Sequence, residues 1–166
     1  MPRTMQGNFI VYGLVGALAI ALLVAAFTDI RRRQIDNWLT AAIALSAPAY
    51  WWAAGLSLWP DVAMMVGVAL LAFVVLAGLF ALKLMGGGDV KLLAALALWL
   101  APMSFVKLLV IMSLIGGVLT ILMAMWHFMM TRRRDAKIPY GVAIAAAGLI
   151  TLAPVLEAGW RSMTGA

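Results

Sequence analysis

Twenty residues near the start of the chain, 9–28, read FIVYGLVGALAIALLVAAFT and include no charged side chain. A helix of this length rises about 30 Å, at about 1.5 Å per residue, and this matches the hydrocarbon core of a bilayer. The run is not flanked like a secretory signal, because only Arg3 precedes it whereas three arginines, 31–33, follow it. It therefore predicts a first membrane-spanning helix.

The rest of the chain has the same apolar character. Of its 166 residues, 66% are hydrophobic and 11% are charged, against about 45–50% and about 25% in soluble domains. One small core cannot hide so much apolar surface, so much of it has to face lipid. The composition excludes an ordinary soluble enzyme, a disordered tail and a nucleic-acid module, and it predicts a single membrane-embedded domain over 1–166.

Five more apolar runs follow the first, and we expect an all-α integral membrane protein of six transmembrane helices. The predicted helices are 9–28, 38–59, 62–82, 90–104, 105–130 and 140–156. Pro48 should kink the second helix without ending it. The fourth run, 90–101, has only twelve residues before Pro102 and rises only roughly 18 Å. Its start should therefore lie below the lipid surface, beside protein or a water-filled cavity.

The basic residues lie in short clusters between the apolar runs, where topology signals belong. Nine of the 12 Lys and Arg residues fall in the connections after the first, third and fifth predicted helices, and three lie elsewhere. This bias predicts cytoplasmic placement for these connections and periplasmic placement for both termini. Trp51 and Trp99 are expected in an interfacial aromatic belt. No nucleic-acid partner is expected, and the oligomeric state is left open.

The sequence contains few residues that could bind a metal or act as a thiol. The chain has no Cys and a single His, His127, which we interpret as an interfacial polar residue of the fifth helix. Disulfides, thiol catalysis and cysteine zinc sites are excluded, and no metal or cofactor is expected. Lys83 is interpreted as a lysine that extends to the lipid headgroups.

Of the six carboxylates, four have ordinary interpretations as helix caps or as solvated and interfacial groups: Asp36, Asp61, Asp135 and Glu157. Asp29 and Asp89 remain. Asp29 lies at the negative end of the first helix, an unfavourable place for a carboxylate, unless it pairs with the arginines that follow. Asp89 could simply cap the fourth helix. Both are predicted on the cytoplasmic side.

Three glycines precede Asp89, more than a helix cap requires. Gly86, Gly87 and Gly88 remove every side chain from the backbone beside the acid, permit positive φ and allow another chain to approach closely. Two aspartates at a wet cavity would share one proton, since like charges close together do not both ionise easily. The ionised member can then take a proton from water while the protonated member polarises a peptide carbonyl. A proton- or ion-coupled transporter and a non-catalytic scaffold are the alternatives.

These residues carry a family resemblance. Residues 86–92, GGGDVKL, resemble the GxGD motif of type IV prepilin peptidases. Asp29 with the basic loop and residues 35–40, IDNWLT, resembles the family's first aspartate segment, and 138–141, IPYG, resembles its approach to the last helix. Two positions depart from the family pattern: Asp36 and Val142 stand where Pro is usual or frequent.

The resemblance implies an aspartic endopeptidase of the bacterial cytoplasmic (inner) membrane. It would cut the leader from prepilins or pseudopilins, whose leader precedes a hydrophobic helix, at the cytoplasmic face and without a cofactor. Asp29 and Asp89 would be catalytic, and Gly86, Gly87, Gly88 and Lys91 would shape the loop or contact substrate. The chain starts at its first helix and lacks Cys, so it resembles the short branch serving Flp/Tad pili, without N-methyltransferase activity. Presenilin-type proteases share GxGD but have Tyr before the first aspartate, where this chain has Thr28.

Overall fold

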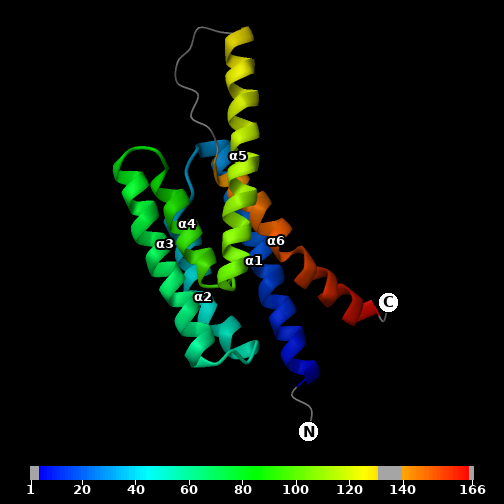
Figure 1. Ribbon diagram of the computed structural model, residues 1–166. Helices are drawn as coiled ribbons and strands as arrows, with labels where there is room; N and C mark the ends of the chain where they lie inside the picture. The colour runs from blue at the N-terminus through cyan, green and yellow to red at the C-terminus, as the bar shows by residue number, and fades with distance from the viewer. Residues whose placement is uncertain (1–3, 131–139, 165–166) are drawn as a thin grey trace.

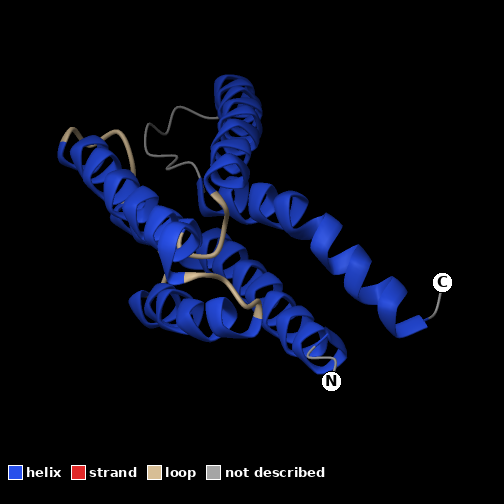
Figure 2. Ribbon diagram, turned by 60° about the horizontal axis from the view of Figure 1, so that its bottom comes forward, coloured by secondary structure: helices blue, strands red, loops and turns tan. Residues whose placement is uncertain are grey.

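The computed structural model describes residues 4–130 and 140–164, and every regular element within these ranges is helical (Figures 1 and 2). The elements are α1 (Thr4–Arg32), α2 (Asn37–Ala53), a π-helical turn η1 (Leu58–Val62), α3 (Ala63–Ala81), α4 (Gly87–Ala97), α5 (Pro102–Met130) and α6 (Tyr140–Thr164). The all-α prediction is confirmed. The basic cluster 132–137 and the first two residues of the IPYG segment lie outside the described residues.

Four stretches of the described chain are long and apolar enough to cross a membrane. They are Phe9–Arg32, Leu58–Ala81, Pro102–Met125 and Tyr140–Ser162. The protein is therefore a multi-pass membrane protein. Helices α2 and α4 have 17 and 11 residues, which rise only about 25 and 16 Å. The count of six transmembrane helices stays a prediction.

The helices depart from the bounds that the apolar runs indicate. The first and last extend beyond 9–28 and 140–156, to Thr4–Arg32 and Tyr140–Thr164, and the second and fourth differ more strongly. The second, expected over 38–59, ends at Ala53 because Gly55 adopts φ 67°, and the N–H groups of Gly55 and Leu56 bond back to carbonyls of the last turn. It continues through Pro48, as predicted. The fourth, expected over 90–104, runs instead from Gly87 to Ala97, because it begins within the glycines and Pro102 already starts α5.

Successive helices run up and down the molecule, and both termini lie at the same end (Figure 1). The α1–α2 and α3–α4 connections lie together at the opposite end. Helix α1 packs along α6, and α4 packs against α3, α2 and α6. Because Leu92, Leu93 and Leu96 are all buried, the short helix α4 is the centre of the fold.

Tryptophan side chains complete the buried end of α4. The Trp51 indole N–H donates to the carbonyl of Leu98 at 2.7 Å, and the Trp99 indole N–H donates to the carbonyl of Ile43 at 2.8 Å. Tyr50 stacks on Trp99. Leu98 lies just past the last residue of α4, where carbonyls lack partners within the helix and need such donors. The expected interfacial position is therefore wrong for Trp99, which is only 4% exposed.

The C-terminal cap of α3 turns the chain towards the glycines at the start of α4. Lys83 adopts the left-handed conformation, with φ 59°. The backbone N–H of Lys83 donates to the carbonyl of Phe80 at 2.9 Å. The backbone N–H of Leu84 donates to the carbonyl of Leu79 at 3.0 Å. This pair of bonds is the usual C-terminal helix cap with a left-handed residue, a position that glycine favours. A residue with a Cβ pays about 1–2 kcal/mol there.

We predict that the free energy of unfolding of Lys83→Gly exceeds that of Lys83→Ala by about 1 kcal/mol, because only glycine relieves the left-handed strain. Lys83→Gly should therefore unfold at the higher temperature. Both variants remove the same ammonium group, so their comparison isolates the backbone. Thermal unfolding in detergent measures the difference. Equal stabilities of the two variants would mean that position 83 is unstrained in the folded protein.

Candidate active site

Asp29 lies in the last turn of α1 and is 6% exposed. Its carboxylate accepts a hydrogen bond from the backbone N–H of Gly141 at 2.8 Å and another from that of Val142. These groups belong to the first turn of α6, where N–H groups lack partners within the helix and the helix dipole is positive. The carboxylate that is poorly placed at the end of α1 is therefore well placed at the start of α6.

Asp89 is the third residue of α4 and is 8% exposed. Gly86, with φ −73° and ψ 143°, holds the N-cap position. The Asp89 carboxylate reaches back to accept the backbone N–H of Gly86, the geometry of the acidic member of a capping box. Asp89 thus accepts the N–H of the N-cap residue from a position inside the helix, whereas the sequence suggested that Asp89 was the N-cap residue itself.

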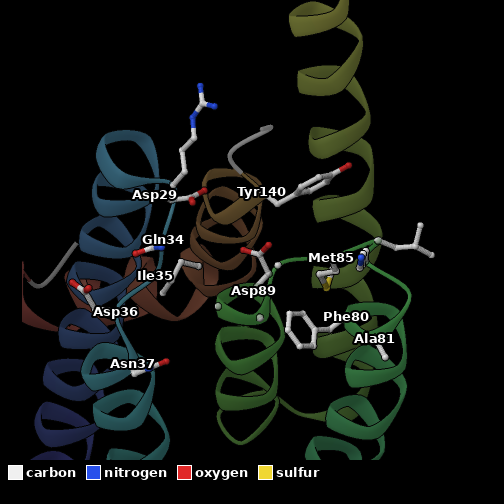
Figure 3. Close-up of a pocket in the computed structure, with 16 residues that line it drawn as sticks. Asp29, Gln34, Ile35, Asp36, Asn37, Phe80, Ala81, Met85, Asp89 and Tyr140 are labelled. Carbon is white, nitrogen blue, oxygen red and sulfur yellow. The ribbon is translucent and has the colours of Figure 1, made fainter. Parts of the chain in front are cut away.

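The two carboxylates line one cavity of about 1070 Å³ at the end of the molecule where the α1–α2 and α3–α4 connections meet. In Figure 3, Asp89 projects from the start of α4 and Asp29 from the end of α1 towards this space. Three short segments and one further side chain complete the lining: residues 33–37, 80–81, 83–88 and Tyr140. Across residues 4–130 and 140–164, no group of three or more His, Cys, Asp or Glu side chains could hold a metal.

The acids influence one another electrostatically. Asp89 lies outside the four candidate membrane spans. Burial raises the pKa of its carboxyl, the negative charge of Asp29 raises it further, to about 6, and the hydrogen bond from Gly86 acts in the opposite direction. A nearby like charge disfavours ionisation of the second acid. The pair therefore retains a proton at a higher pH than two separate aspartates would.

The glycines before Asp89, together with Gly141, make room for carboxylates and for the neighbouring connection. A Cβ on Gly86 would lie 2.8 Å from an oxygen of Asp89, and a Cβ on Gly141 would lie 2.8 Å from an oxygen of Asp29. A Cβ on Gly88 would lie 3.1 Å from that of Ile35, so α4 starts tightly against the α1–α2 connection. The suggested use of positive φ is wrong, because Gly86 has φ −73° and the next two glycines are helical. Space, and not backbone conformation, is what requires glycine here.

Other residues singled out from the sequence are divided between the cavity and its surroundings. Lys83 lines the cavity. Lys91 does not, and its ammonium group instead donates to the side-chain oxygen of Asn37 at 2.8 Å. Asp36 occupies the N-cap position of α2 without a side-chain capping bond, and its carboxylate points away from Asp89 (Figure 3).

Sequence reasoning assigned no role to Gly141 or Ile35. Gly141 supplies an N–H to Asp29, and Ile35 packs on the start of α4. The signal available in the sequence was the Tyr140-Gly141 pair at the start of the last helix. Its meaning depends on a contact between residues 112 positions apart.

A model of the type IV leader peptidase family matches residues 16–121. The chain belongs to this family. The matched part of the chain includes both Asp29 and Asp89 and ends before Gly141. Over 66 residues, 40% of the chain, it is 41% identical to the prepilin leader peptidase/N-methyltransferase of Xanthomonas campestris pv. campestris. The match covers 22% of that relative's length. No solved structure gives a significant match.

We predict that Gly141→Ala destabilises the protein by about 1–3 kcal/mol, because the added methyl group overpacks against the Asp29 carboxylate. In an Asp29→Gly background the same change should be nearly neutral, since the three atoms nearest to the added methyl group all belong to the Asp29 side chain. Thermal unfolding of the four proteins in detergent completes the double-mutant cycle. An equal loss in both backgrounds would show that Gly141 is needed for a reason other than room for Asp29.

Proposed function

We propose that this chain is an aspartic endopeptidase that removes the leader of prepilins or pseudopilins, with Asp29 and Asp89 as its catalytic pair. One observation carries the proposal. In a member of the type IV leader peptidase family, two buried carboxylates from distant parts of the sequence line a single cavity. The Xanthomonas relative is a prepilin leader peptidase/N-methyltransferase, and this supports the substrate class.

The pair acts through a shared proton. The ionised carboxylate takes a proton from a water molecule while the water oxygen bonds to the carbon of the scissile peptide, and the protonated carboxyl donates to the peptide oxygen. Collapse of the tetrahedral intermediate breaks the C–N bond, and the leaving nitrogen receives a proton from the carboxyl that first accepted one. A hydroxyl group of the intermediate returns its proton to the other carboxylate as the product acid forms, and the pair again holds one proton. Water is the only co-reactant in this sequence of steps.

The position of the acids favours peptidase chemistry over proton or ion transport. Both lie in terminal turns of helices, at the end of the molecule that holds the α1–α2 and α3–α4 connections. Transporters place such acids near mid-membrane, between broken helices of two similar halves. A cavity at the end of the helices is open to a peptide that approaches from the aqueous phase.

The bias of basic residues supports a cytoplasmic location for this cavity in the bacterial inner membrane. Cleavage would then take place at the cytoplasmic face, with the hydrophobic helix of the substrate in the bilayer. We further propose that the substrates are Flp/Tad-type prepilins and that the activity is peptidase alone, without N-methylation. Mass spectrometry of the mature amino terminus tests the second point, since methylation adds a fixed mass.

We predict that Asp29→Asn and Asp89→Asn each reduce leader cleavage by about 10²–10⁴-fold, the usual loss when a general acid or base is removed. The assay is the gel shift of a co-expressed Flp-type prepilin from the same genome.

Asp61→Asn is the matched control. The Asp61 carboxylate bonds to the backbone and hydroxyl of Ser57, in the connection between α2 and α3 at the other end of the molecule. It should cleave like wild type, and all variants should insert to equal levels in the membrane fraction. Near-normal cleavage by either active-site variant would refute the assignment of the pair.

The raised pKa of Asp89, about 6, predicts a falling pH profile. The active form needs one proton on the pair, so kcat/KM should fall at least tenfold between pH 6 and pH 8 as that proton is lost. An acetylated leader peptide without groups that titrate in this range serves as substrate. Unfolding temperatures over the same range check that the fold persists. A rate that stays level from pH 6 to pH 8 would contradict the shared proton.

A further inference from the structure

A second hollow, the α2–α3–α4 groove, lies next to the acid cavity. Its volume is about 470 Å³. Each helix contributes four residues spaced i, i+3, i+4 and i+7, so that one stripe of each helix faces the groove. The stripes are Asn37, Thr40, Ala41 and Ala44 of α2; Val66, Ala69, Leu70 and Phe73 of α3; and Lys91, Ala94 and Ala95 of α4 with its C-cap residue Leu98.

The packing of the helices explains why the groove is open. Helices α2 and α3 both pack on α4 but scarcely touch one another, so α4 forms a floor between two walls. The rim on α3 is apolar and open, with Leu70 63% and Phe73 47% exposed. The remaining apolar lining is mostly alanine. Small side chains at this spacing let the backbone of another helix approach closely in a membrane.

The groove and the acid cavity share one residue. Asn37 lines both, and its side-chain oxygen accepts the ammonium N–H of Lys91 at 2.8 Å. Asp89 and Lys91 are two residues apart on α4, so the helix presents them to different sides, the acid to the cavity and the lysine to the groove. A chain that leaves the acids over Asn37 therefore enters the groove at its polar end.

We propose that the α2–α3–α4 groove seats the apolar helix that follows the scissile bond of the substrate, with the Lys91–Asn37 pair at the point where the chain passes to the acids. The inference rests on the proposed peptidase function. A stripe from i to i+7 is about 10 Å long, so the groove holds about two turns of the substrate helix. The extended leader lies in the acid cavity, while the groove determines which membrane-anchored chains are held there.

The test fills the groove without touching the acids. Ala41 and Ala44 line it from α2, whereas the neighbouring residue Ala42 is exposed and lies outside it. Ala41→Phe and Ala44→Phe are compared with Ala42→Phe in proteoliposomes. The substrates are a full-length prepilin and a soluble leader peptide that ends shortly after the scissile bond.

The groove variants should raise KM for full-length prepilin at least tenfold, leave kcat unchanged and cleave the soluble peptide like wild type. Ala42→Phe should match wild type on both substrates. Prepilin cleavage by the groove variants that equals that of Ala42→Phe overturns the proposal. An equal loss on both substrates also overturns it, because the substitution then acts on the acid cavity. Loss of one co-purified phospholipid per chain, with both cleavages unchanged, assigns the groove to lipid instead.

Photo-crosslinking separates this inference from the proposed function. A photoreactive phenylalanine at position 41 or at position 42, in an Asp29→Asn and Asp89→Asn background, is exposed to prepilin that stays uncut. Crosslinks from position 41 to the apolar helix of the prepilin, and none from position 42, support the groove whether or not Asp29 and Asp89 are the catalytic pair. Equal crosslinking from both positions, or none from either, overturns it. If wild type cleaves no prepilin and position 41 does not crosslink, both proposals fail together.

Discussion

The structure depends on how two carboxylates are buried at one end of a membrane protein. A buried carboxylate needs hydrogen-bond donors, and the unpaired N–H groups at the start of a helix are the nearest ones. Asp29 takes those of α6, which binds the end of the first helix to the start of the last. Asp89 takes the one before its own helix. In each case the donor is a glycine, Gly141 for Asp29 and Gly86 for Asp89, and a Cβ on that glycine would lie too close to the carboxylate that it binds.

The short helix α4 lines both the acid cavity and the α2–α3–α4 groove, and it is fixed by packing against α2, α3 and α6. Its leucines are buried among α2, α3 and α6, and the indoles of Trp51 and Trp99 tie its far end to α2. A helix fixed in this way can direct neighbouring residues to different sides. Asp89 faces the acid cavity, and Lys91 two positions later faces the groove. One rigid element thereby sets the position of the acid relative to any helix in the groove.

The residues whose interpretation changed share a physical reason. The glycines before Asp89 were credited with positive φ, but they are needed because Phe80, Ile35 and the acid itself occupy the space around them. Trp99 was expected at the membrane surface, yet it is an internal hydrogen-bond donor. Lys91 was grouped with the acid loop although it faces the neighbouring groove. In each case the partner is distant in the sequence or lies on another face of the helix.

The sequence by itself determined the all-α membrane character, the family and the two aspartates worth testing. Long apolar runs, the distribution of charge and a local glycine–acid motif are properties of contiguous residues, and they can be read without knowledge of distant contacts. Only the tertiary structure decided which N–H groups hold Asp29, why Gly141 must be glycine and where Lys91 points. These depend on contacts between α1 and α6 and between α2 and α4, which no local pattern encodes.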